Sequence, residues 1–338
     1  MLGLGRKPWK RAIGERGFGY VVNILKTRQL QVVLGTTQGT YEGQVKKTQL
    51  PVLIDELGDL DGGKLMWIGK RRKGRGEKVV LYIPGGGFIF PMQEPGVAFW
   101  GHLQAQFEHE GKPASVACLN YSLVPTVDFP TPLVQVILAI HHLISLDIAI
   151  SDIHLAGDSA GANIVVQVLT HILHPLPGVP QLKLNGEKLG SVTLISPWMI
   201  LSTTPTSLRS RAQYDSTDIL KAKTIQYWGD QVLASVPSRQ IRYIEPTKAP
   251  PGWLTDIPTL VARMLVIAGE EECLIEDIRL FVAKLNSEVD TKEMELVYFE
   301  QPMGVHVDPY LDFVLPMREE DMAESGRVVR KWIGRAFE

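Results

Sequence analysis

Short apolar runs alternate with longer apolar segments of helical spacing over the last three quarters of the chain. The short runs predict strands, at residues 79–83, 115–119, 153–156, 190–195, 264–268 and 294–299. The longer segments predict helices, at residues 133–146, 162–173, 274–285 and 319–332. Strands that alternate with helices of this length predict right-handed βαβ units, so we expect an α/β fold with a mostly parallel central sheet and helices on both faces.

Two stretches interrupt this rhythm. Residues 1–75 precede the first clear strand, and residues 200–255 separate two strands by far more than a normal crossover. The second stretch is rich in proline turns and aromatic side chains. We expect residues 76–338 to form one domain in which about residues 200–255 are inserted as a helical cap, and residues 1–75 to contribute to the same cap.

Residues 18–34 carry apolar positions at roughly helical spacing, which predicts an amphipathic helix. Such a stripe usually faces the protein interior, and we favour that interpretation. Membrane contact of this N-terminal segment is the alternative.

Composition narrows the classes of function. The 338 residues include 35 Lys and Arg against 37 Asp and Glu, a formal charge of −2, which excludes a strongly basic nucleic-acid binder. The 2 cysteines form no disulfide framework, and no apolar signal-peptide core follows the basic N-terminus, so we expect an intracellular, cytoplasmic protein. No motif indicates a metal, a cofactor or an oligomeric state.

The pentapeptide Gly157-Asp158-Ser159-Ala160-Gly161 fits the pattern G-x-S-x-G. It follows a predicted strand and opens a predicted helix, which is the context that this motif requires. The turn is so tight that the positions two residues from the serine must lack side chains, and it lifts the hydroxyl clear at a helix N-terminus. We therefore predict Ser159 as a nucleophile.

Three glycines follow Pro84 and another predicted strand, upstream of the serine. Glycines expose backbone N–H groups and let a carbonyl group approach closely, which suits an oxyanion hole. A phosphate-binding turn would need a lysine beside it and a helix that starts at once, and neither is present.

A nucleophilic serine needs a base, and the base needs an orienting acid. Most of the 8 histidines fall on predicted helices or strands, whereas His306 lies in a loop after the last predicted strand. The chain order serine, acid, histidine favours His306 as the base. The acid should follow the strand at 264–268, where five carboxylates lie between Glu270 and Asp277, and spacing does not choose among them.

These residues resemble the hormone-sensitive-lipase-like branch of the α/β-hydrolase superfamily, and in particular the fungal steryl-acetyl-hydrolase-like esterases. The resemblance runs from about residue 31 to the C-terminus and rests on the glycine triplet, the serine elbow and five further segments, at 120–125, 129–130, 196–198, 227–229 and 305–310. It implies an α/β-hydrolase fold with Ser159 as nucleophile, His306 as base and Glu272 as acid. It also implies the N–H groups of Gly86, Gly87 and Ala160 as oxyanion donors.

Two residues depart from the family pattern. Pro84 stands where the family usually has histidine, and the acid is Glu where many relatives have Asp. We expect a serine hydrolase that cleaves a small acyl ester of a hydrophobic alcohol, sterol-like or a secondary metabolite, through an acyl-enzyme. Two alternatives stay open: an amide or thioester hydrolase with the same triad, and a non-catalytic ligand-binding protein of this fold.

Overall fold

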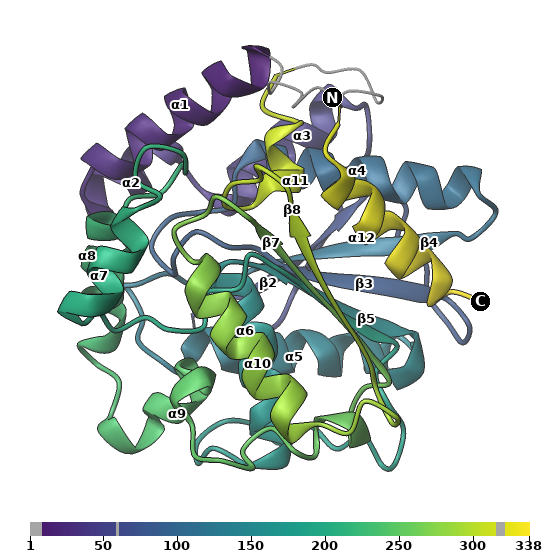
Figure 1. Cartoon of the computed structure of the whole chain (residues 1–338). Helices are drawn as coiled ribbons and strands as arrows, with labels where there is room; N and C mark the ends of the chain where they lie inside the picture. The colour runs from purple at the N-terminus through teal and green to yellow at the C-terminus, as the bar shows by residue number, and fades with distance from the viewer. Residues whose placement is uncertain (1–8, 59–60, 316–321) are drawn as a thin grey trace, which may run out of the picture.

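The computed structural model describes residues 9–58, 61–315 and 322–338. Its centre is an eight-stranded sheet in the order β1-β2-β4-β3-β5-β6-β7-β8 (Figure 1). From β4 to β8 all neighbouring strands are parallel, whereas β2 is antiparallel to both β1 and β4. The strands are β1 (Ile54–Glu56), β2 (Lys64–Ile68), β3 (Lys78–Ile83), β4 (Ala114–Asn120), β5 (Ile153–Asp158), β6 (Ser191–Ile195), β7 (Arg263–Gly269) and β8 (Glu295–Gln301). The predicted α/β architecture is confirmed.

Helices cover both faces of this sheet (Figure 1). One face packs against α3, α4 and α12, and the other against α6 and α10, with α5 beside α6. The helices are α1 (Trp9–Ile24), α2 (Thr27–Leu34), α3 (Thr37–Lys47), α4 (Glu94–His109), α5 (Thr131–Ser145), α6 (Ala160–Leu173), α7 (Pro205–Ala212), α8 (Ala222–Leu233), α9 (Ile241–Ile244), α10 (Ile275–Glu288), α11 (Asp308–Leu311) and α12 (Glu324–Arg335).

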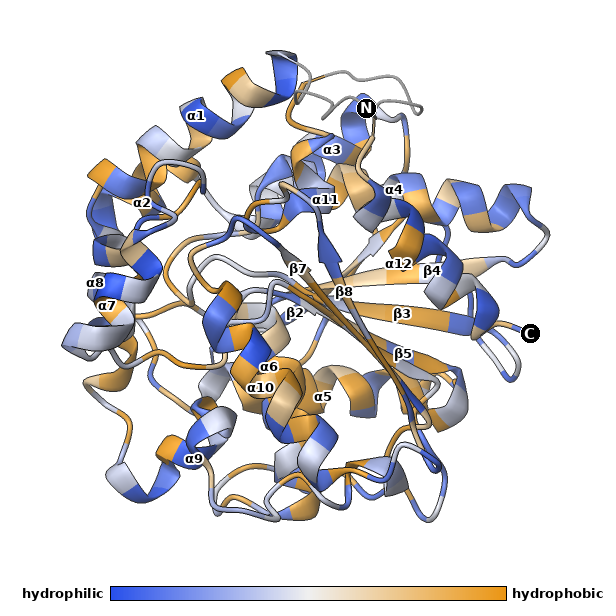
Figure 2. Ribbon diagram, in the orientation of Figure 1, coloured by the Kyte–Doolittle hydropathy of each residue, from blue (hydrophilic) through white to orange (hydrophobic). Residues whose placement is uncertain are grey.

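The inner strands are apolar on both faces because helices cover both. In β3, Val79 and Leu81 pack into the core cluster on the α6 side, while Val80 and Tyr82 pack into the cluster on the α4 side. Successive side chains of a strand point to opposite faces, so an unbroken apolar run is what such a strand requires. Figure 2 shows these strands as continuous hydrophobic bands at the centre of the molecule.

The segment 1–75 divides between two parts of the molecule. Strands β1 and β2 extend the sheet, although the sequence analysis placed the first strand at residue 79 and assigned the whole segment to the cap. The apolar run of β2, residues 65–68, is buried on both faces like the runs of the inner strands, so the expectation that the first strand lies at residue 79 is wrong. Of this segment, only α1 and α2 lie beside α8, and residues 1–8 fall outside the described part of the chain.

The helix expected at 18–34 is two helices. The backbone is extended at Lys26, which ends α1 and starts α2. The closing helix, expected from residue 319, begins at Glu324 in the described chain, and residues 319–321 lie outside it. Within the described residues, no helix combines the length and the apolar content that crossing a membrane requires.

Helices α1 and α2 pack against the inserted segment. Asn23 donates to the carbonyl of Ile219 at 2.7 Å and accepts from the hydroxyl of Thr224 at 2.7 Å. The hydroxyl of Thr27 donates to Gln231 at 2.9 Å. We refer to α1, α2, α7 and α8 as the cap helices; in Figure 1 they form one group at the left of the sheet.

Candidate active site

Ser159 occupies the sharp turn between β5 and α6. Its φ is +50°, a value that L residues other than glycine rarely adopt, and its N–H donates to the carbonyl of Ile195 at 2.9 Å. The turn leaves no room for side chains nearby, because a Cβ on Gly161 would lie 2.0 Å from the carbonyl oxygen of Ile83 and one on Gly157 would lie 2.6 Å from the backbone of Gly161. The glycines on either side of the serine are therefore steric requirements of the turn.

His306 lies in the loop between β8 and α11, and its side chain is buried against Ser159. Its Nε2 is 2.9 Å from the Oγ of Ser159, within hydrogen-bond distance. Residues 147 positions apart in the sequence are thus in direct contact.

Glu272 lies behind His306, on the side away from the serine. Its Oε2 accepts from the hydroxyl of Ser196 at 2.6 Å and from the N–H of Gly269 at 3.0 Å. Its Oε1 is 3.8 Å from the Nδ1 of His306, an ion-pair distance that is longer than a hydrogen bond. Neither of these two atoms has a hydrogen-bond partner among the described residues, so both are available to each other. Contacts of this kind often shorten when substrate binds.

The other carboxylates of this loop have different surroundings. Glu276 pairs with Arg279 at 2.8 Å, and the buried Asp277 pairs with Arg211 at 2.8 Å. The acids at positions 270 and 271 are exposed and half-buried, respectively. Of the five candidates that spacing left open, Glu272 is the one that the fold brings to His306.

Asp218 is a residue of this site that the sequence analysis missed. Its Oδ1 accepts from the N–H of His306 at 2.9 Å and from the N–H of Ile219 at 2.8 Å, and its Oδ2 accepts from the N–H of Cys273 at 2.7 Å. Cys273 directly follows Glu272, so one carboxylate from the inserted segment holds both the His306 loop and the Glu272 loop. No sequence signal could have found it, because it acts on backbone groups and belongs to no motif.

The glycine loop after β3 lines the same cavity as Ser159. The N–H of Gly85 donates to the carboxylate of Asp158 at 3.0 Å, and the hydroxyl of Tyr121 donates to the carbonyl of Pro84 at 2.9 Å. Gly86 has a φ of +108°, and a Cβ there would lie 2.2 Å from the carbonyl oxygen of Phe90. These contacts hold the loop in a conformation that glycine alone tolerates, with Pro84 in place of the usual histidine.

Three backbone donors of this region face no protein acceptor. Within the described chain, no hydrogen bond is made by the N–H groups of Gly86, Gly87 and Ala160. The two glycines line the same cavity as Ser159, and Ala160 is the first residue of α6, whose N-terminal N–H groups have no partner inside the helix. Unpaired donors beside a serine are available to an anionic oxygen.

Comparisons with known proteins agree with this geometry. Residues 80–306 match a family model described as the alpha/beta hydrolase fold. The chain belongs to the α/β-hydrolases. A search of curated protein sequences finds no match.

Several solved structures resemble this α/β-hydrolase over nearly their whole length. An esterase from the bacterial hormone-sensitive lipase family is 21% identical with a TM-score of 0.68, and the match covers 97% of this chain and 100% of that chain. A hyperthermophilic esterase from the archaeon Pyrobaculum calidifontis is 20% identical with a TM-score of 0.68, covering 98% and 97%. An esterase/lipase from an uncultured bacterium is 18% identical with a TM-score of 0.67, covering 97% of each chain. At these identities, the likeness establishes a shared fold over nearly the whole chain.

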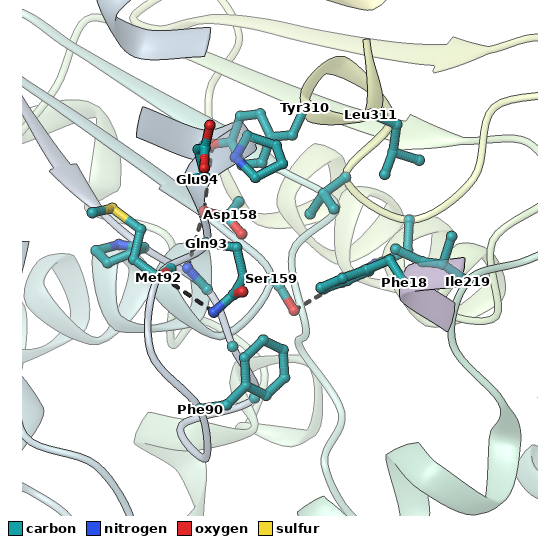
Figure 3. A pocket seen from close by; sticks show the side chains of 18 of the residues that line it. Phe18, Phe90, Met92, Gln93, Glu94, Asp158, Ser159, Ile219, Tyr310 and Leu311 are labelled. Carbon is teal, nitrogen blue, oxygen red and sulfur yellow. Dashed lines mark hydrogen bonds between the residues drawn. The ribbon is translucent and has the colours of Figure 1, made fainter. Parts of the chain in front are cut away.

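A cavity of about 330 Å³ lies over Ser159 in this α/β-hydrolase. Figure 3 shows Phe18 from α1 and Phe90 from the loop before α4 on two sides of the serine. Trp228 of α8 and Ile219 also contribute apolar side chains. The cap helices therefore form part of the cavity wall, and the side chains named here make that part apolar.

Three carboxylates set the charge around the histidine. Burial by itself lowers the pKa of His306, but Glu272 first, and then Asp218 and Asp158, raise it, so that its pKa lies above the ordinary 6.5. Burial raises the pKa of both Asp158 and Asp218 to about 6. The carboxylates around His306 in this α/β-hydrolase thus favour its imidazolium form.

Proposed function

We propose that the protein is a serine carboxylic ester hydrolase that uses Ser159, His306 and Glu272. The observation that carries the proposal is the 2.9 Å contact between Ser159 Oγ and His306 Nε2 beneath an apolar cavity, with the Glu272 carboxylate behind the imidazole. Membership of the α/β-hydrolases supports the same reaction class.

The reaction begins when Ser159 Oγ attacks the carbonyl carbon of the ester and His306 Nε2 takes the hydroxyl proton. Glu272 stabilises the resulting imidazolium through Nδ1–H and holds the ring in this orientation. The N–H groups of Gly86, Gly87 and Ala160 donate to the negatively charged carbonyl oxygen of the tetrahedral intermediate. Each such donor contributes about 2.7–4 kcal/mol to lowering the barrier in acyl transfer.

The intermediate collapses when the C–O bond to the alcohol breaks and His306 gives its proton to the leaving oxygen. A water molecule then attacks the acyl-enzyme, and His306 takes one of its protons. A second collapse releases the carboxylic acid and returns the proton to Ser159 Oγ. No cofactor enters this cycle.

The side chains of the cavity wall support a hydrophobic substrate. Aromatic and aliphatic side chains from the cap helices and from the loop before α4 favour an ester with a hydrophobic acyl or alcohol group. We infer a short acyl ester of a hydrophobic alcohol as the preferred substrate.

The test is hydrolysis of p-nitrophenyl acetate and p-nitrophenyl octanoate by the wild type and by Ser159→Ala. We expect the variant to lose kcat by a factor on the order of 10⁶ with an unchanged thermal transition. Ser287→Ala removes an exposed hydroxyl whose one hydrogen bond among the described residues is to the carbonyl of Lys284, and it serves as the matched control. An unchanged rate in Ser159→Ala rejects Ser159 as the nucleophile.

Two other outcomes would point to a different function. A folded wild type that binds hydrophobic esters tightly without cleaving them would identify a ligand-binding protein. Amides that are cleaved faster than matched esters would change the reaction class.

A further inference from the structure

Helix α1 is apolar on two opposite sides. Its inner side packs on the protein: Val22 is fully buried and Phe18 lines the cavity. Its outer side carries Trp9, Ile13 and Tyr20, which are 68%, 58% and 67% exposed. Large apolar side chains that gather on an exposed surface often mark a site of contact with a partner or a membrane, so the outer side of α1 is a candidate for such a contact.

The outer residues form one stripe. Trp9, Ile13, Tyr20 and Ile24 fall within an arc of roughly 60° at 3.6 residues per turn. The next helix, α2, adds Val32 and Val33, which are 82% and 63% exposed. Among the described residues, two thirds of the large exposed hydrophobic side chains lie on these two helices, the others being Leu50, Val52 and Leu280. Figure 2 shows α1 and α2 at the outer edge of the molecule.

The exposed charges on α1, α2 and the link between them have one sign. Between residues 9 and 34 the exposed charged side chains are all basic: Lys10, Arg16, Lys26 and Arg28. The one acid in this range, Glu15, is buried and bonds Arg11 at 2.8 Å. This local positive charge contrasts with the whole chain, whose formal charge is −2. Basic residues beside exposed tryptophan, tyrosine and isoleucine match an anionic lipid surface, where the rings and aliphatic chains enter the headgroup boundary and the cations meet the phosphates.

We propose that the outer faces of α1 and α2 dock on an anionic membrane surface, with α1 lying in the plane of the interface. The buried side of α1 is fixed to the protein beneath. Arg11 is hydrogen-bonded to Asp312 at 2.7 Å and also pairs with Asp308, at the helix that follows His306. Because Phe18 lies on that buried side and lines the cavity, docking brings the cavity next to the bilayer, where hydrophobic esters partition.

The first test is flotation of the full chain with phosphatidylcholine vesicles prepared with and without phosphatidylserine. We expect the wild type to float with the anionic vesicles and to bind those of phosphatidylcholine alone at least tenfold more weakly. The triple variant W9A/I13A/Y20A removes three of the six large exposed apolar side chains of α1 and α2 while keeping helix-forming residues. We expect it to bind anionic vesicles at least tenfold more weakly than the wild type.

Two further variants separate the contributions. Arg16→Gln with Arg28→Gln should weaken binding to anionic vesicles and reduce its dependence on salt, because it removes two of the exposed cations. Leu280→Ala truncates a side chain that is 56% exposed on α10, far from α1, and it is the matched control, with binding expected to equal that of the wild type. All variants should keep the wild-type rate on p-nitrophenyl acetate, since none of these residues lines the cavity.

Three outcomes would overturn the proposal. The first is a wild type that stays unbound with anionic vesicles, and the second is a W9A/I13A/Y20A variant that floats like the wild type. The third is a dimer in sedimentation velocity that this variant abolishes without any vesicle binding, which would assign the stripe to a second copy of the chain. Ser159→Ala should float like the wild type, so docking is tested separately from hydrolysis.

Discussion

The two sides of the candidate active site are built differently. The nucleophile side is part of the central sheet: Ser159 is clamped between β5 and α6, with glycine backbones packed against neighbouring strands at distances that admit no Cβ. The base side comes from two loops, and Asp218 of the inserted segment bonds to the backbone of both. The position of the serine thus depends on close packing in the core, whereas the positions of the histidine and the acid depend on a few polar contacts that reach outside the sheet.

This difference gives the two sides different weaknesses. A change on the nucleophile side should act through folding stability, since the turn cannot form with an added side chain. A change on the base side should alter kcat and its pH dependence while the free energy of unfolding stays nearly constant. The reason is that buried apolar residues of the two loops, such as Leu274 and Val305, remain in place. The following predictions, in order of expected size, test that division.

The largest effect is expected at the acid. Glu272→Gln keeps the side-chain shape and removes the charge that stabilises the imidazolium, so kcat should fall by roughly 10³- to 10⁴-fold. Glu272 is also the main partner that raises the pKa of His306, so this pKa should fall. Glu276→Gln changes an exposed carboxylate of the adjacent turn and is the control for local effects. Equal rates for Glu272→Gln and the wild type in ester hydrolysis would remove Glu272 from the mechanism and reopen the choice of acid.

The core of the site was predictable from sequence because steric demands leave local marks. A glycine two residues before and after Ser159, a preceding apolar strand and a following helix are all visible in the chain itself. The same is true of the parallel sheet, whose inner strands must be apolar on both faces. Strand β1 left no such mark, because it has 3 residues and lies at the edge of the sheet. Strand β2 carries an apolar run of the same kind as the inner strands, at residues 65–68, so its signal was present and was passed over.

The choice of Glu272 and the role of Asp218 could not be predicted from the sequence. Five carboxylates lie within eight positions, and only the folded loop decides which of them faces His306. Asp218 lies 88 residues from the histidine whose N–H donates to it. Every residue other than proline has a backbone N–H, so a backbone donor leaves no residue pattern in the sequence. The contact between His306 and Asp218 could therefore be found only in the structure.

The second prediction tests the nucleophile side. A methyl group at Gly161 would lie 2.0 Å from the carbonyl oxygen of Ile83 and 2.6 Å from that of Pro84, both rigid backbone atoms. Gly161→Ala should therefore lower the free energy of unfolding by about 1–3 kcal/mol or more, measured by urea denaturation. Gly43→Ala on α3, where a Cβ would meet no atom within 4 Å, should be neutral or slightly stabilising. A Gly161→Ala variant as stable as the wild type would show that the turn relaxes easily and that the comparison is wrong.

The smallest effect is expected at Asp218. Its variant distinguishes the hydrogen bonds that hold two loops from the negative charge that raises the pKa of His306. Asp218→Asn keeps one acceptor oxygen, so either the His306 loop or the Cys273 loop loses its hydrogen bond, and we expect kcat to fall by about tenfold, roughly 1.4 kcal/mol in barrier height. The carboxylate also contributes to raising the pKa of His306. The base works as neutral imidazole, so activity is lost as pH falls through this pKa, and removing the charge should move that loss to lower pH. Asp230→Asn, an exposed change on α8, should leave both the rate and the pH profile unchanged. A lower rate with the acidic limb in its wild-type position would restrict Asp218 to holding the loops, while a shifted limb would show that the inserted segment also tunes the base.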